Sequence, residues 1–131
     1  MNLRTLLASQ EEFGSHQFAH TTNRKDVVAF DFDGVLCMTD GPYQHNHFGP
    51  PLKQGMNLLR MVIAHGYQPV VFTARKETDS VAQWMGGQGF PGLLVTNHKP
   101  VAIAYVDDRA IHFDGSSSAI DIFKKILKRA K

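Results

Sequence analysis

Short apolar segments alternate with amphipathic segments along most of this chain, and the alternation predicts an α/β fold. Four apolar runs have the length of strands: Val27–Phe30, Gln68–Phe72, Leu93–Val95 and Ala102–Val106. The first of them lacks alternating polar positions, which is typical of a strand buried on both faces of a parallel sheet. Apolar residues at helical spacing predict helices over Lys53–His65, over Thr78–Met85 and after the serines at 116–118. Ile111–Phe113 is a candidate for a short fifth strand.

The order of these elements is strand, loop and helix, strand, helix, strand, strand, helix. This order favours a three-layer, doubly wound (Rossmann-like) fold with a mainly parallel sheet. A chain of 131 residues has room for one core but not for two. We therefore assign residues 25–131 to a single domain and residues 1–24 to an N-terminal extension with helical spacing of its leucines.

Composition narrows the class of protein. A hydrophobic content of 43% with 20% charged residues is ordinary for a globular domain, and the net charge of +2 gives little support for a nucleic-acid partner. Cys37 is the single cysteine, so no internal disulfide can form, which fits a reducing compartment. No apolar run approaches the ~20 residues that span a bilayer. We expect a cytoplasmic protein that does not bind a membrane. The sequence is compatible with an oligomer as well as with a monomer.

Two aspartates and a glycine follow the first strand directly. Asp31 and Asp33 are two residues apart, so their side chains point to the same side while the chain stays extended, and Gly34 then permits a sharp turn. Placing two unpaired carboxylates beside a core is costly, which indicates a bound cation or a catalytic task. The alternative is a plain turn at Asp33–Gly34 with Asp31 in solvent.

Further polar residues follow the other predicted strands. They are Thr73, Ala74 and Arg75 after the second, Lys99 after the third, and Asp107, Asp108 and Arg109 after the fourth. Parallel strands end at a common edge where ligands bind, so we expect one site there. Carboxylates without clustered cysteine or histidine favour Mg²⁺ over zinc. Lysine and threonine are suitable partners for phosphate oxygens, and a carboxylate can attack phosphorus.

The motifs D-F-D-G-V-L, V-V-F-T, a lone lysine and V-D-D, in that order, resemble the haloacid dehalogenase (HAD) superfamily of phosphohydrolases. The resemblance covers roughly residues 26–113. The V-D-D-R ending is similar to one variant of the family's last motif and differs from its more frequent G-D-x-x-x-D form. This difference leaves open whether Asp107 or Asp108 binds the metal directly, and we favour Asp108.

The resemblance implies a role for each motif residue. Asp31 would be the nucleophile, and Asp33 the general acid and base, with its backbone carbonyl on Mg²⁺. Thr73 would bind the transferring phosphoryl group and Lys99 would offset negative charge. The metal site would comprise Asp31, Asp33, Asp107 and Asp108. Substrate contacts would come from Thr73, Ala74, Arg75, Lys99 and Arg109, although both arginines equally suit surface ion pairs.

The intervals between the motifs are too short for a separate cap domain, so the resemblance implies an open active site. The expected reaction is Mg²⁺-dependent hydrolysis of a phosphomonoester, on a small molecule or a polymer end, through an aspartyl-phosphate. A phosphotransferase or a polynucleotide-end phosphatase is an alternative of the same fold. A catalytically silent phosphate-binding module or a signalling receiver is the non-enzyme alternative, but a receiver has its acidic pair first along the chain. His45 and His47 are either exposed loop residues or substrate contacts.

Overall fold

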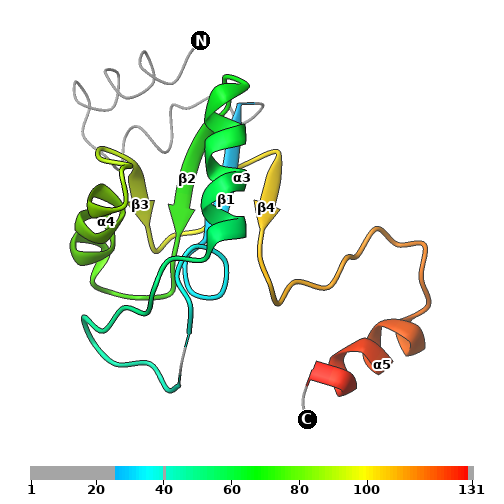
Figure 1. The fold of residues 1–131 in the computed structure, drawn as a ribbon. Helices are drawn as coiled ribbons and strands as arrows, with labels where there is room; N and C mark the ends of the chain where they lie inside the picture. Colours follow the sequence, from blue (N-terminus) through cyan, green and yellow to red (C-terminus); the bar gives the residue numbers. More distant parts are fainter. Residues whose placement is uncertain (1–25, 40, 130–131) are drawn as a thin grey trace.

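A parallel sheet of four strands forms the centre of the computed structural model, which describes residues 26–39 and 41–129 (Figure 1). The strands are β1 (Val27–Asp31), β2 (Gln68–Phe72), β3 (Leu94–Thr96) and β4 (Ala104–Val106). They lie in the order β3-β2-β1-β4, and each neighbouring pair is parallel. The predicted α/β, Rossmann-like sheet is confirmed. The proposed extension over residues 1–24 lies outside the described residues.

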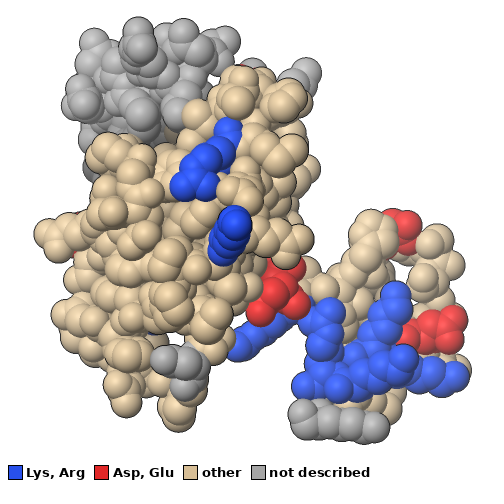
Figure 2. Space-filling model, viewed as in Figure 1, with Lys and Arg blue, Asp and Glu red and all other residues tan. Residues whose placement is uncertain are grey.

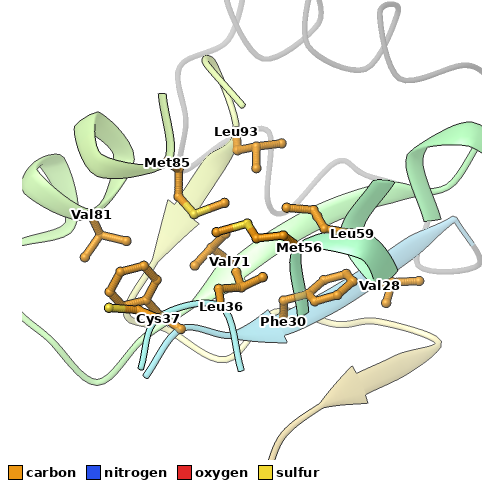
Figure 3. Packing of buried hydrophobic residues seen from close by; sticks show 11 residues of the cluster. Val28, Phe30, Leu36, Cys37, Met56, Leu59, Val71, Val81, Met85 and Leu93 are labelled. Atoms are coloured by element: carbon orange, nitrogen blue, oxygen red, sulfur yellow. The ribbon is translucent and has the colours of Figure 1, made fainter. Parts of the chain in front are cut away.

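Three helices accompany the sheet: α3 (Lys53–Ala64), α4 (Thr78–Gly87) and α5 (Ala119–Arg129). Parallel neighbours need a crossover connection, and α3 and α4 supply it between β1 and β2 and between β2 and β3. Both crossover helices pack on the face of the sheet that carries Phe30 and Val71. Figure 3 shows this cluster, to which they contribute Met56, Leu59, Val81 and Met85.

The opposite face of the sheet carries a smaller buried cluster. Val27, Val70 and Leu94 form it, from three neighbouring strands. Within the described residues, helix packing on the sheet is confined to the Phe30 face. The third layer of the predicted architecture therefore stays a prediction.

The chain turns tightly after β1, and Phe32 is the centre of the turn. Its backbone carbonyl accepts hydrogen bonds from the N–H groups of Leu36 (2.9 Å) and Cys37 (3.0 Å). Its fully buried ring meets the rings of Phe48 and Trp84 edge to face, with centroids 5.8 and 5.3 Å away. Because Phe32 points into the core, the flanking Asp31 and Asp33 are directed away from it, as the two-residue spacing predicted.

The segment after β4 differs from expectation. Ile111–Phe113 forms no strand, so that prediction was wrong, and the Phe113 side chain is exposed. A strand needs a neighbour to pair with, and this segment instead runs into a turn in which Asp114 accepts the Ser116 N–H (2.8 Å). The predicted serine cap is present: the Ser118 hydroxyl oxygen accepts the Asp121 N–H at 3.2 Å, at the start of α5.

Helix α5 is amphipathic but has no buried residue. Four of its apolar side chains are exposed, namely Ile120, Phe123, Ile126 and Leu127, and Ile122 is half-buried. Its lysines and arginine gather on one side of the helix (Figure 2). The helix dipole favours those that lie in the last turn, near the C-terminus. Among the described helices, none combines the length and the apolar character that crossing a membrane requires.

Gly55 in α3 tests how closely this helix approaches the turn after β1. A Cβ atom there would collide with the backbone carbonyl of Val35, which cannot move away freely. We expect Gly55→Ala to lower the free energy of unfolding by on the order of 2 kcal/mol, although alanine is intrinsically better in a helix by ~1 kcal/mol. The measurement is urea unfolding followed by circular dichroism.

Gly87→Ala in α4 is the matched control, because no heavy atom lies within 4 Å of the added Cβ. This variant should be as stable as the wild type or slightly more stable. Equal stabilities for the two glycine variants would contradict the close approach of α3.

Candidate active site

Three carboxylates meet at the carboxyl edge of the sheet. Asp31 ends β1, and Asp107 and Asp108 directly follow β4, the neighbouring parallel strand. One carboxylate oxygen from each lies within 4.8 Å of the others. The strand pairing therefore gathers three of the four predicted metal-binding residues into one group, which we call the acidic cluster (Asp31, Asp107, Asp108).

Gly34 allows Asp108 to join the acidic cluster. Gly34 has φ +89°, a conformation that side chains with a Cβ rarely adopt, and its Cα faces the Asp108 carboxylate. A Cβ atom at this position would collide with that carboxylate. The glycine of the first motif thus serves both the turn and the placement of Asp108.

The acidic cluster carries strong electrostatic repulsion. Burial, followed by the negative charges of Asp107, Asp108 and Asp33, raises the pKa of Asp31 from 3.8 to about 6. A hydrogen bond from the Phe32 N–H to Asp31 Oδ1 (2.9 Å) acts in the opposite direction. An all-oxygen group of this charge fits a hard divalent cation such as Mg²⁺, whose charge would remove the repulsion.

Asp33 is held apart from the acidic cluster by Arg75. Arg75 Nε donates to Asp33 Oδ2 and Nη2 donates to Oδ1, both at 2.9 Å. The arginine is only 8% exposed, so its charge is paired inside the wall of the site. An ion pair of Arg75 is present, but it is buried and joins a proposed catalytic residue, and the substrate contact of Arg75 stays a prediction. The predicted metal contact of Asp33 involved its backbone carbonyl, which stays a prediction.

Thr73 lies at the end of β2, beside the end of β1. Thr73 is buried, and its Oγ1 accepts a hydrogen bond from the Arg75 N–H at 3.0 Å. The strand register places Phe72, the preceding residue, opposite Asp31. Thr73 therefore follows the strand end that lies beside Asp31, and its contact with a phosphoryl group stays a prediction.

Lys99 lies in the wall of a cavity that also includes part of the acidic cluster. It lines a cavity of about 240 Å³ together with Asp31 and Asp107. Its ammonium nitrogen lies over the Tyr105 ring, 4.7 Å from the centroid. Within the described part of the chain, Lys99 has no ion pair closer than 4.0 Å, so its charge remains available to an anionic ligand.

A larger cavity of about 750 Å³ also borders the acidic cluster. Its wall includes Asp31, Asp33 and Asp107, together with the predicted contacts Ala74, Arg75 and Arg109. Residues 41–49, which we call the flap, supply the remaining side of this cavity with Tyr43, Gln44 and His47. Four of the five proposed substrate-binding residues thus divide between two cavities that share Asp31 and Asp107, and Thr73 lines neither of them.

Glu77 anchors the flap and was not recognised in the sequence. Its carboxylate accepts the Tyr43 hydroxyl (2.7 Å) and the Asn46 N–H (2.8 Å), and His45 Nδ1 lies 3.4 Å away. Burial opposes the charge of Glu77, but these hydrogen bonds outweigh it and lower its pKa to about 2. His45 therefore contacts the anchor, whereas His47 lines the larger cavity.

Comparison with known proteins supports the fold but gives no function. No family model matches the chain, and no curated protein matches its sequence. The structure is similar to that of a conserved protein from Bacteroides thetaiotaomicron, with a TM-score of 0.53 and 17% identity. The similarity covers 82% of this chain and 93% of the other.

Gly34→Ala tests the contact between the turn and Asp108. The added Cβ should displace the Asp108 carboxylate and weaken Mg²⁺ binding at least tenfold in a calorimetric titration. Gly66→Ala is the matched control, because Gly66 has a similar φ of +85° but no atom within 4 Å of the added Cβ. Both variants carry backbone strain, so equal Mg²⁺ affinities would show that the contact with Asp108 is unimportant.

Asp31→Asn tests the repulsion within the acidic cluster. The raised pKa means that the folded state favours protonated Asp31, so its contribution to stability is lost as pH rises from about 4 through 6. Asparagine mimics the protonated form at every pH. Without divalent metal, Asp31→Asn should gain on the order of 1 kcal/mol of unfolding free energy at about pH 8 and little at about pH 4.

Urea unfolding at the two pH values measures this difference. Asp121→Asn, an exposed carboxylate on α5, is the control and should change little at either pH. A loss of stability in Asp31→Asn at about pH 8 would contradict the repulsion.

Proposed function

We propose that this protein is a Mg²⁺-dependent phosphomonoester hydrolase of the HAD type that acts through an aspartyl-phosphate on Asp31. The observation that supports this function best is the meeting of the acidic cluster, Lys99 and Thr73 at one edge of a parallel sheet. Acidic residues alone occur on many surfaces. A group of carboxylates suited to a cation, in a cavity wall that also includes Lys99, is more specific, because it matches a phosphate dianion together with its counter-ion.

The acidic cluster is the proposed Mg²⁺ site. Asp31, Asp107 and Asp108 would hold the ion, which matches their oxygen-only chemistry. When bound, the ion would neutralise charge on the carboxylates and on the phosphate. Lys99 and Thr73 would then have separate tasks in binding the phosphoryl group. Lys99 offsets the charge that remains on the phosphoryl oxygens, and the Thr73 hydroxyl donates a hydrogen bond to one of them.

Two displacements at phosphorus complete the proposed reaction. A carboxylate oxygen of Asp31 attacks phosphorus, the bond to the ester oxygen breaks, and Asp33 gives its proton to the leaving oxygen. Asp33, now a carboxylate, takes a proton from water as that water attacks phosphorus. The bond between Asp31 and phosphorus breaks, which releases inorganic phosphate and restores the Asp31 carboxylate.

The larger cavity is the proposed position of the leaving group. It extends from Asp31 and Asp33 toward the flap, so an ester oxygen attached to a phosphate at Asp31 would have Asp33 beside it. Its volume of about 750 Å³ suits a leaving group well beyond the size of a methyl or ethyl alcohol. The side chains of Arg109 and His47 in its wall are polar contacts for such a group.

Phosphate release from an aryl phosphate and from a panel of biological phosphate esters tests the function. Turnover should require Mg²⁺, stop in EDTA, and fall by on the order of 10³-fold or more in Asp31→Asn, which cannot accept the phosphoryl group. Asp121→Asn should retain full activity. Equal rates for Asp31→Asn and the wild type would remove the nucleophile assignment, and a wild type without turnover on any ester would contradict the function.

A further inference from the structure

Arg75 contacts both an acidic residue of the site and the flap, although the proposed reaction assigns it no chemical step. Its guanidinium group holds both Asp33 oxygens, and its Nη1 lies 3.5 Å from Glu77 Oε2. It therefore joins a proposed catalytic carboxylate to the anchor of the flap. Nη1 is buried and has no hydrogen-bond partner among the described residues, where charge and packing hold this third branch.

Three aromatic rings surround the Arg75 guanidinium. Its central carbon lies 5.7 Å from the Phe32 ring centroid, 5.1 Å from that of Tyr43 and 4.7 Å from that of Phe48. Two of these rings belong to the flap. Cation–π contacts of this kind are stronger where water is excluded, as it is around a residue that is 8% exposed. The flap thus fixes the position of Arg75, and Arg75 in turn fixes Asp33.

The geometry of this pair fixes the direction of the Asp33 carboxyl group. Two hydrogen bonds from one planar guanidinium hold both oxygens of Asp33, so the group cannot rotate without breaking one of them. An ester with a good leaving group needs little help from an acid, whereas water must still lose a proton when it attacks the aspartyl-phosphate. With such an ester, the placement of Asp33 therefore matters for the second displacement and much less for the first.

We propose that Arg75 is a positioning residue for the hydrolysis of the aspartyl-phosphate. Held by the flap, it keeps Asp33 oriented toward the attacking water. This role rests on the proposed function. It predicts that the two displacements respond differently when Arg75 is changed, whereas a purely structural role would affect both.

An aryl phosphate with a good leaving group separates the two displacements. Such an ester needs little help from an acid, so kcat/KM reports the transfer to Asp31 and kcat reports hydrolysis of the aspartyl-phosphate once that step is slow. We expect Arg75→Met to lower kcat at least tenfold while kcat/KM changes less than threefold. A burst of released phenol should then precede the steady state. Arg75→Lys, which keeps the charge but not the fork, should recover part of kcat.

Two matched controls accompany these variants. Arg60→Met removes another arginine that lies over an aromatic ring, 5.3 Å from the Phe90 centroid, on the exposed side of α3. Tyr67→Phe removes an exposed hydroxyl away from the flap. Both should leave kcat and kcat/KM unchanged.

Tyr43→Phe keeps the test valid if the buried arginine cannot be replaced without loss of the fold. It retains the ring over Arg75 but removes the hydroxyl that donates to Glu77. We expect a two- to fivefold fall in kcat, again with little change in kcat/KM. Trp84 is the single tryptophan and stacks on Phe48 with a centroid separation of 6.2 Å, so its emission reports directly whether each variant keeps the flap in place.

The outcomes separate the two proposals. Suppose that the wild type turns over, and that the variants Arg75→Met and Tyr43→Phe either lower kcat and kcat/KM equally or change neither constant. Then Arg75 does not position the base, and only this inference is overturned. If the wild type releases no phosphate from any ester, the proposed function fails and the role of Arg75 fails with it. A fall in kcat alone, with the burst, supports both.

Discussion

The pairing of β1 with β4 is the constraint on which the site depends. Neighbouring parallel strands end at the same edge, so residues that follow them are brought together without any contact between their side chains. Here the residues are three aspartates, and their proximity is unfavourable in the absence of a cation. The rest of the fold must offset that cost. The buried face formed by Phe30, Val71 and the two crossover helices supplies stability at a distance from the charges.

The turn after β1 sets the directions of Asp31 and Asp33 in the site. Phe32 is anchored in the core by its ring and by its carbonyl, so the two flanking aspartates are held on the opposite side of the chain. They nevertheless have different surroundings. Asp31 faces other carboxylates, whereas Asp33 faces a buried arginine. Two residues of one short motif are therefore prepared for different chemistry, as the proposed roles of nucleophile and base require.

Much of the sheet and of the acidic cluster could be predicted from the sequence, because both follow from local patterns. Apolar runs of strand length defined β1 to β4, and the order of the elements placed Asp31 and Asp107 at one edge. The pair of Arg75 and Asp33 could not be assigned, since it joins residues 42 positions apart and an arginine at a strand end suits an exposed ion pair equally well. Glu77 gave no signal, because its partners are a hydroxyl and a backbone amide of a distant loop. Ile111–Phe113 was misassigned because none of the described strands lies beside its apolar residues to pair with them.

The central claim is that Asp31 itself carries the phosphoryl group. Reduction of the protein with borohydride during turnover of a phosphate ester tests it most directly, because an aspartyl-phosphate is converted to homoserine and the modified residue can be located by peptide mass spectrometry. The account predicts homoserine at position 31, and only when Mg²⁺ and substrate are both present. Modification at Asp33, Asp107 or Asp108 instead, or no modification while phosphate is being released, would contradict it.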